Sequence, residues 1–228
     1  MHIILNKKPN RYTREEKMAQ PLDIILAFHN AFRNDMQRID RAARDTARGK
    51  TGLSQEIERF RFFNEILVWH ANGEEQAIFP EVEKVAPLVA EAYERDHRGL
   101  DAAFDALNSA VTARDLLETS RTSAAFKFHL DIHLGKEDAH LYRIMRERIP
   151  IPEQARAVGI MSKAVPQERF PEAIAWLFSL INLDDQENVM LIWQMAMMPE
   201  VFSQVKLLVQ KATGDGWADL VRRVPTLE

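Results

Sequence analysis

The sequence HANGEEQAIFP, residues 70–80, places a histidine and a glutamate four positions apart, and HLGKEDAHLY, residues 133–142, repeats that spacing. Residues four apart in a helix lie on one face, one turn from each other. If the two segments are helical, each pair therefore offers an imidazole and a carboxylate to the same point. The pairs are His70 with Glu74 and His133 with Glu137.

The chain around these motifs has the periodicity of helices. Apolar residues recur at steps of three and four in four segments, whereas the alternating β-branched runs of strands are missing and only 8 glycines occur. The loop at 49–52 and the prolines Pro80, Pro87 and Pro150 separate or end these segments. Four such helices joined by short loops predict an all-α fold, an up-down-up-down four-helix bundle over residues 20–150.

Two further histidines lie in the apolar stripes of the other two predicted helices. They are His29, between residues 23 and 44, and His97, in the stripe of residues 93–111. At a rise of about 1.5 Å per residue, all four helices can bring their histidines and glutamates to one level near one end of the bundle. A carboxylate is costly to bury without a partner or a metal. Four imidazoles and two carboxylates suit one or two iron-like ions, so the sequence predicts a metal site in the bundle core.

The composition limits the chemistry of that site. The 228 residues include no cysteine, which excludes disulfides, thiolate zinc sites and iron–sulfur clusters, so any metal must be held by nitrogen and oxygen. The hydrophobic content of 46% and a net charge of −4 are ordinary for a globular protein and give no sign of a nucleic-acid surface. The N-terminus lacks the pattern of a signal peptide, and the most apolar later stretch, residues 189–198, is too short to cross a bilayer. We therefore expect a cytoplasmic protein without membrane contact.

The character of the chain changes after Pro152. Residues 153–228 contain no histidine, carry most of the methionines and predict several shorter helices. We interpret residues 151–228 as an accessory helical region without chemistry of its own. We expect a protein partner or a second copy of the chain to bind through residues 153–228.

Four motifs together resemble one known family. HANGEEQAIFP and HLGKEDAHLY, with FHNAFR at 28–33 and DHRGL at 96–100, resemble the hemerythrin-like HHE cation-binding domain over about residues 20–150. The resemblance implies a non-haem di-iron centre, two iron ions with an oxo or hydroxo bridge, inside a four-helix bundle. By position it implies terminal histidines and bridging glutamates: His29, His70, His97 and His133 as terminal ligands, and Glu74 and Glu137 as bridges.

The chain departs from the oxygen-carrying members at two places. Those proteins have a second histidine four residues after the one on the third helix, where this chain has Asp101. They also carry the last carboxylate one residue further on, which here would be Asp138. We favour Glu137, because it shares the apolar face of His133.

Three other residues are candidates for an additional or outer role. His129 precedes His133 by one turn, and it is either a fifth imidazole or a neighbour beside the site. Asp101 and Tyr93 flank His97 by one turn each. For Asp101 the alternative is a solvated charge, and for Tyr93 it is packing with a hydrogen-bonded hydroxyl.

The ligand set permits three functions. Iron fits best, with zinc or manganese as possible substitutes, and about eight protein bonds leave positions for solvent or a small ligand. The first function is a di-iron protein that binds dioxygen, nitric oxide or peroxide in sensing, storage or stress response, which the histidine-rich set favours. The second is a peroxide-decomposing or oxidase enzyme with Tyr93 or His129 as proton donor. The third is a helical interaction module with a structural metal.

Overall fold

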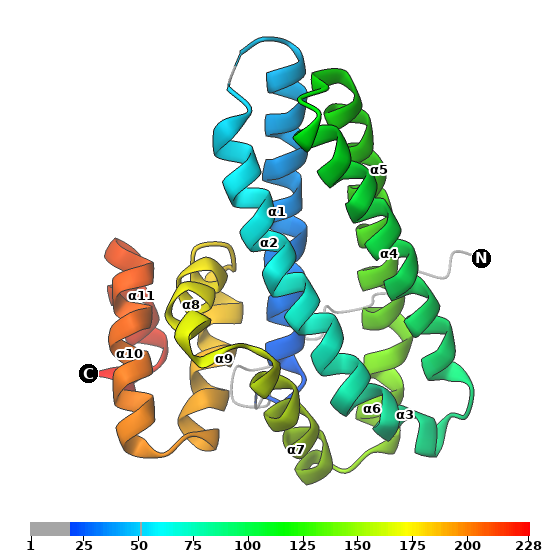
Figure 1. Cartoon of the computed structure of the whole chain (residues 1–228). Coiled ribbons are helices and arrows are strands. Elements are labelled where there is room, and N and C mark those ends of the chain that lie inside the picture. The colour runs from blue at the N-terminus through cyan, green and yellow to red at the C-terminus, as the bar shows by residue number, and fades with distance from the viewer. Residues whose placement is uncertain (1–18, 51) are drawn as a thin grey trace, which may run out of the picture.

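The computed structural model describes residues 19–50 and 52–228, and within these residues every regular element is a helix (Figure 1). The all-α fold class is thereby confirmed. The predicted absence of a signal peptide concerns residues that lie largely outside the described ranges. Among the described residues no helix combines the length and the apolar character needed to cross a membrane.

Long helices dominate the described residues up to 148, and shorter helices follow from residue 151. The elements up to residue 148 are α1 (Asp23–Ala47), α2 (Ser54–Gly73), η2 (Glu74–Ile78), α3 (Phe79–Val85), α4 (Val89–Thr112), α5 (Leu116–Lys136), η3 (Glu137–Leu141) and α6 (Tyr142–Arg148). The later elements are α7 (Ile151–Met161), η4 (Ser162–Ala164), η5 (Gln167–Arg169), α8 (Phe170–Phe178), α9 (Leu183–Ala196), α10 (Pro199–Thr213), η6 (Gly214–Gly216), α11 (Trp217–Arg223) and η7 (Pro225–Leu227).

The described residues up to 148 form a helical bundle because each long helix buries one apolar stripe. On α1 the buried stripe includes Ile25, Phe32, Met36 and Ile39, at the spacing of one helix face. Helix α1 packs against α2 and α5, and α5 in turn packs against α4. Short connections join successive helices (Figure 1). The stripes meet in a core of closely packed aromatic rings around Phe32 and the helices opposite it.

Two of the helical rods contain a π-helical turn. In η2 the N–H of Phe79 donates to the carbonyl of Glu74, and in η3 the N–H of Tyr142 donates to that of Glu137, each over five residues. The helix is disturbed before Pro80, as the sequence predicts, but it does not end there, because it continues through α3. A proline ring clashes with the carbonyl four residues before it, and the wider turn directly ahead of Pro80 gives it room.

The C-terminal helices pack against the bundle and share its core. Helix α7 lies against η2, while α8 and α9 lie beside α1, with α10 and α11 outside them (Figure 1). Polar contacts reinforce this packing, since Asn34 donates to the carbonyl of Leu180 at 2.8 Å and Trp176 donates to Asp35 at 2.8 Å. A single apolar cluster runs from Phe63 in the bundle to Val209 on α10. The division of the chain at residues 150 and 151 stays a prediction.

Candidate metal centre

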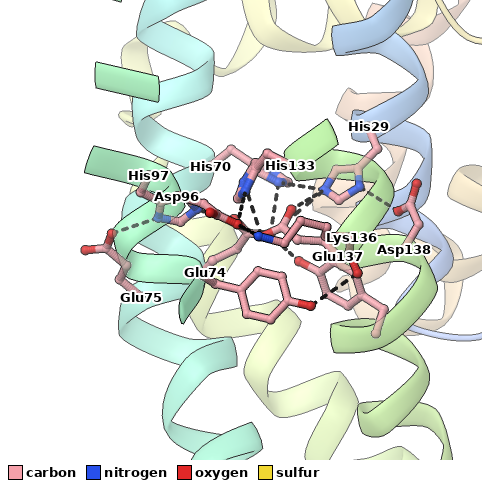
Figure 2. A network of polar contacts seen from close by, with 12 residues as sticks. His29, His70, Glu74, Glu75, Asp96, His97, His133, Lys136, Glu137 and Asp138 are labelled. Atoms are coloured by element: carbon pink, nitrogen blue, oxygen red, sulfur yellow. Dashed lines mark hydrogen bonds and ion pairs between the residues drawn. The ribbon is translucent and has the colours of Figure 1, made fainter. Parts of the chain in front are cut away.

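Six side chains meet at one level of the bundle (Figure 2). Each long helix of the bundle contributes at least one of these side chains, because each of them lies on the helix face that points into the core. All six are at most 7% exposed. They are His29 on α1, His70 on α2, Glu74 at the start of η2, His97 on α4, His133 on α5 and Glu137 at the start of η3.

The first half of the cluster combines two histidines with both glutamates. Nε2 of His29 lies 3.1 Å from Nε2 of His70 and 3.5 Å from Oε2 of Glu137. Nε2 of His70 lies 3.2 Å from Oε1 of Glu74. One ligand atom from each of these residues lies within 4.8 Å of every other, as binding of a single ion requires.

The second half combines the other two histidines with the same glutamates. Nε2 of His97 lies 3.4 Å from Oε2 of Glu74, and Nε2 of His133 lies 3.3 Å from Oε1 of Glu137. Their ligand atoms satisfy the same 4.8 Å limit. Each glutamate therefore turns one oxygen toward each half. This is the arrangement in which carboxylates can join two ions.

Carboxylates outside the cluster orient two of the imidazoles. Oδ1 of Asp138 lies 2.7 Å from Nδ1 of His29, and Oε1 of Glu75 lies 2.8 Å from Nδ1 of His97 (Figure 2). Because a carboxylate accepts, these contacts assign the ring proton to Nδ1 and leave Nε2 as a lone pair aimed into the cluster. Asp138 also accepts from Arg33. The carboxylate of Asp96 is 3.8 Å from Nδ1 of His133, beyond hydrogen-bond distance.

The inward-facing atoms fit a cation. Nε2 of His97, Oε2 of Glu74 and both carboxylate oxygens of Glu137 are buried without a hydrogen-bond partner. Unpaired acceptors that face each other in a buried site repel unless a proton or a metal lies between them. The cluster therefore has the ligand atoms of a metal site, all nitrogen or oxygen, and several of these atoms have no other partner.

When no metal is bound, protons can bind some of these acceptor atoms. Burial and the neighbouring charge of Glu74 raise the pKa of Glu137 well above its usual range. Burial would raise the pKa of Glu74 as well, but the surrounding histidines outweigh burial and lower it. The pKa of His133 falls to about 3, chiefly because the ring is buried. Protons and metal ions thus compete for the same lone pairs.

A tyrosine that the sequence analysis did not single out also reaches the cluster. The hydroxyl of Tyr142, on α6, donates to Oε1 of Glu74, and the side chain is 1% exposed. Burial and the charge of Glu74 raise its pKa well above the usual range. Tyr142 lies five residues after Glu137, and the π turn between them is what brings both to one face. In the sequence, the signal for this contact was the spacing of five residues between Glu137 and Tyr142.

The additional candidates lie elsewhere. Tyr93 is buried, but its hydroxyl donates to the carbonyl of Lys136 at 3.2 Å, and burial with the charge of Glu137 raises its pKa to about 12. His129 is exposed on α5 and contacts the ring of Phe128, so it does not join the cluster. Asp101 is exposed on α4, at the rim of a pocket that leads to the site.

Comparison with known proteins agrees with this geometry. A family model described as the hemerythrin HHE cation-binding domain matches residues 20–94, which include His29, His70 and Glu74. The match ends before His97, so the structure alone places the remaining cluster residues. No solved structure matches the chain.

The curated relatives come from Arabidopsis thaliana. The chain is 27% identical to the zinc finger protein BRUTUS over 187 residues, which cover 79% of this chain and 15% of that protein. Two BRUTUS-like zinc finger proteins are 22% and 23% identical, covering 81% and 80% of this chain. The chain therefore spans only 15% to 17% of the length of these relatives.

Fold, cluster and family match agree on one assignment. The match covers α1, α2, η2, α3 and the beginning of α4, and the remaining cluster residues lie beyond it, His97 on α4, His133 on α5 and Glu137 in η3. Over residues 20–94 the chain is similar to the hemerythrin HHE cation-binding domain, and together with the buried His/Glu cluster this similarity supports a hemerythrin-like, metal-binding protein.

Proposed function

We propose that the cluster holds two iron ions and that the loaded protein binds dioxygen, nitric oxide or peroxide in sensing, storage or a stress response. The observation that carries this proposal is that two groups of ligand atoms share both glutamates. The ions would be held by His29 and His70 on one side and His97 and His133 on the other, with Glu74 and Glu137 between them. Bound iron supplies Lewis acidity and one-electron redox changes at this point. The proposal includes the cytoplasmic location expected from the sequence.

The chain's own residues have distinct parts in this function. Asp138 and Glu75 hold the imidazoles of His29 and His97 in the ligating tautomer. The six cluster residues are at most 7% exposed, and burial strengthens the charge interactions among them. Tyr142 keeps a proton on its hydroxyl at Oε1 of Glu74.

That hydroxyl supports a second candidate function, a di-iron enzyme that decomposes peroxide or acts as an oxidase. Such an enzyme needs a proton donor beside the reacting centre. Tyr142 meets this requirement, whereas Tyr93 and His129, the donors expected from the sequence, do not contact the cluster. The third candidate, a module with a structural metal, remains the alternative if iron has no exchangeable ligand.

We also propose that residues 151–228 form an accessory region and that a protein partner or a second copy of the chain binds through residues 153–228. Exposed apolar side chains on α9 and α10, among them Met195 and Leu207, support this proposal. The name zinc finger belongs to the relatives. This chain has no cysteine to supply the thiolate ligands of a zinc finger.

Anaerobic loading with ferrous iron, followed by air, tests the proposed iron site and separates the first two functions. Binding of two irons per chain and a stable visible absorption band on exposure to air, nitric oxide or peroxide support the first function. Rapid turnover of added peroxide supports the enzyme instead. If iron never binds in stoichiometric amounts and the metal-free protein folds identically, the proposal of an iron site fails.

A matched pair of histidine variants makes the loading experiment specific. His70→Ala removes a buried cluster imidazole, and His140→Ala removes an exposed imidazole of η3 that lies outside the cluster. We expect the first variant to lose stoichiometric iron binding and the second to retain it. Equal loading of both would show that iron binds elsewhere.

A further inference from the structure

The surface of α5 carries a row of apolar and small side chains. Leu117 is 58%, Phe128 63% and Ile132 48% exposed. Steps of three, four and seven residues keep the row on one side of the helix, opposite the buried His133. Contiguous exposed apolar side chains of this kind mark an interaction site. The row, named the outer stripe of α5, consists of Leu117, Ala124, Ala125, Phe128, Ile132 and Gly135, all of them exposed.

Within the described residues, the outer stripe stays exposed although α5 packs on two sides. Helices α1 and α4 cover those two sides, and the C-terminal helices α8 and α9 lie against α1, away from α5 (Figure 1). The charges beside the stripe are largely compensated within the chain. The ion pairs are Lys127 with Asp131, Lys136 with Asp96, and Arg121 with Glu118.

The outer stripe has a similar pattern in both chain directions from Leu130. Phe128 and Ile132 each lie two residues from Leu130, and Ala125 and Gly135 each lie five residues from it. A two-fold axis at this level would therefore place the two large side chains of one copy against those of the other. The small residues would face each other at both ends, where they let the helices approach closely. A contact between two copies of one chain about a two-fold axis requires such self-complementarity.

The charges beside the stripe match under the same symmetry. With the helices antiparallel about Leu130, Lys127 of one copy lies within two residues of the level of Asp131 of the other, about 3 Å along the helix axis. Both side chains are partly exposed, at 30% and 38%, and both lie on the same edge of the stripe. Opposite charges therefore meet twice across the axis. An unrelated partner would have to supply this pattern separately, whereas a second copy of the chain supplies it by symmetry.

We propose that α5 binds α5 of a second copy of this chain in an antiparallel dimer through the outer stripe. The stripe is about 27 Å long and about 10 Å wide, so two copies would bury on the order of 1,000 Å² in total. That area is at the low end for specific interfaces and fits a weak, reversible dimer. The proposal concerns a different face from residues 153–228 and does not depend on bound metal.

Sedimentation velocity of the full chain over a concentration series measures the self-association. We expect the average mass to rise from one chain toward two chains, and Phe128→Glu and Ile132→Glu each to weaken the dimer at least tenfold. Leu207→Glu on α10 is the matched control, because Leu207 is 63% exposed, as Phe128 is. It should leave the dimer affinity unchanged. Circular dichroism checks that all three variants are folded.

Two results of this measurement would refute the proposal. The first is a chain that stays monomeric at every concentration. The second is a dimer that dissociates in Leu207→Glu but not in Phe128→Glu, which would place the contact in residues 153–228 instead.

The absence of native cysteine allows the direction of the two helices to be tested. Ala125→Cys and Gly135→Cys each add one thiol, and a Cβ added at Gly135 meets nothing within 4 Å. A mixture of the two proteins should crosslink with a short bifunctional maleimide at least tenfold faster than either protein alone. The reason is that the two copies of position 125 lie about 15 Å apart along an antiparallel pair. Ala125→Cys mixed with Val201→Cys, a control thiol on α10, should crosslink no faster than Ala125→Cys alone. Fast crosslinking of each protein with itself would overturn the antiparallel arrangement.

Charge reversal tests the same arrangement without a crosslink. Lys127→Glu should weaken the dimer at least threefold at low ionic strength, because it places carboxylates opposite each other. The double variant Lys127→Glu/Asp131→Lys should restore the affinity of the native dimer to within twofold. Equal affinities in the single and the double variant would overturn the antiparallel contact.

Discussion

Glu137 and Asp138 are neighbouring carboxylates with different environments. Glu137 turns both oxygens toward the cluster histidines, at 3.5 Å from His29 and 3.3 Å from His133. Asp138 contacts the opposite ring nitrogen of His29 and is partly exposed. At the scale of single residues, this geometry assigns the two carboxylates different parts in metal binding.

Substitution of each carboxylate by its amide tests this assignment. Glu137→Gln should reduce iron from two ions per chain to one or none, because a shared ligand is lost. Asp138→Asn should keep two ions and weaken affinity about 10–100-fold, as loss of a partner behind a ligating histidine does. Elemental analysis and competition with a chelator measure both. If Asp138→Asn loses iron and Glu137→Gln retains it, the carboxylates have been assigned the wrong way round.

Tyr142 and Tyr93 form a second matched pair. Tyr142→Phe removes the hydroxyl that donates to Glu74, so the carboxylate loses a fixed partner and iron affinity should fall about 10–100-fold. Tyr93→Phe removes a hydroxyl bonded to the backbone of Lys136 and should leave iron affinity unchanged. Chelator competition gives the affinities, and circular dichroism checks that both variants are folded. Equal effects in the two variants would contradict a direct contribution of Tyr142.

The sequence was sufficient to predict which six side chains converge, because ordinary helical spacing places His70 with Glu74 and His133 with Glu137. It did not predict the outer partners. Asp138 and Glu75 follow the cluster glutamates directly and point away from the stripe, so a helix-face argument reads them as surface charges. Tyr142 was missed because its alignment with Glu137 depends on a π turn.

At the scale of elements, the contact between η2 and α7 bears on the position of Glu74. Gly73 precedes Glu74, and a Cβ added there would lie 2.5 Å from Cγ and 3.0 Å from the carbonyl oxygen of Met161. Close packing of this kind allows no added methyl group without a shift of one element. The glycine therefore permits α7 to approach the turn that carries a cluster ligand.

Gly73→Ala should lower the free energy of unfolding by about 1–3 kcal/mol and weaken iron affinity, because the clash displaces η2. Gly99→Ala is the control, since its added Cβ meets nothing within 4 Å and it lies within α4. That control should raise the free energy of unfolding by about 0.5–1 kcal/mol, as alanine replaces glycine in a helix. Urea denaturation of both variants measures the two shifts. A neutral Gly73→Ala variant with normal iron affinity would show that α7 does not hold η2 in place.

The spacing of apolar residues predicted that the long helices exist, but it did not predict their turns and ends. The four long rods were predicted, but the continuation through Pro80 depends on η2, a turn that apolar spacing does not reveal. Helix α11 does not follow from the sequence in the same way, because Gly214 and Gly216 before it are typical of the end of a helical region. They form a tight 3₁₀ turn, and the chain then re-enters the core at Leu220.

At the scale of the whole molecule, the continuous core bears on the predicted division at residue 150. Phe32 of the bundle and Trp193 of α9 belong to one apolar cluster. Asp35, which is 1% exposed, accepts from Trp176 at 2.8 Å and from Nε of Arg59 at 2.8 Å. A shared core and shared buried polar contacts favour unfolding in one cooperative step.

The variant Trp69→Phe tests whether the protein unfolds in one step, because its remaining tryptophans all lie after residue 150. They are Trp176, Trp193 and Trp217. Fluorescence then reports the C-terminal helices, whereas far-ultraviolet circular dichroism reports the entire helical content. We expect coincident urea transitions in the metal-free protein. Asp35→Ala, made in this background, should lower the free energy of unfolding by about 1–3 kcal/mol and move both transitions together, because it leaves the buried indole N–H of Trp176 unpaired. Asp45→Ala, near the end of the same helix, should shift them by less than about 0.5 kcal/mol.

Separate transitions would instead establish residues 151–228 as an independently unfolding region. The two results differ in whether bound iron stabilises residues 151–228 as well as the bundle. If the molecule unfolds as one unit, iron bound in the bundle raises the midpoint of both signals, since a ligand that binds only the folded state stabilises everything folding with it. If it unfolds in two steps, iron shifts only the dichroism of the bundle and leaves the fluorescence transition in place. Repeating the titration with iron-loaded Trp69→Phe protein therefore decides whether a partner of the C-terminal helices can sense the occupancy of the cluster through folding stability.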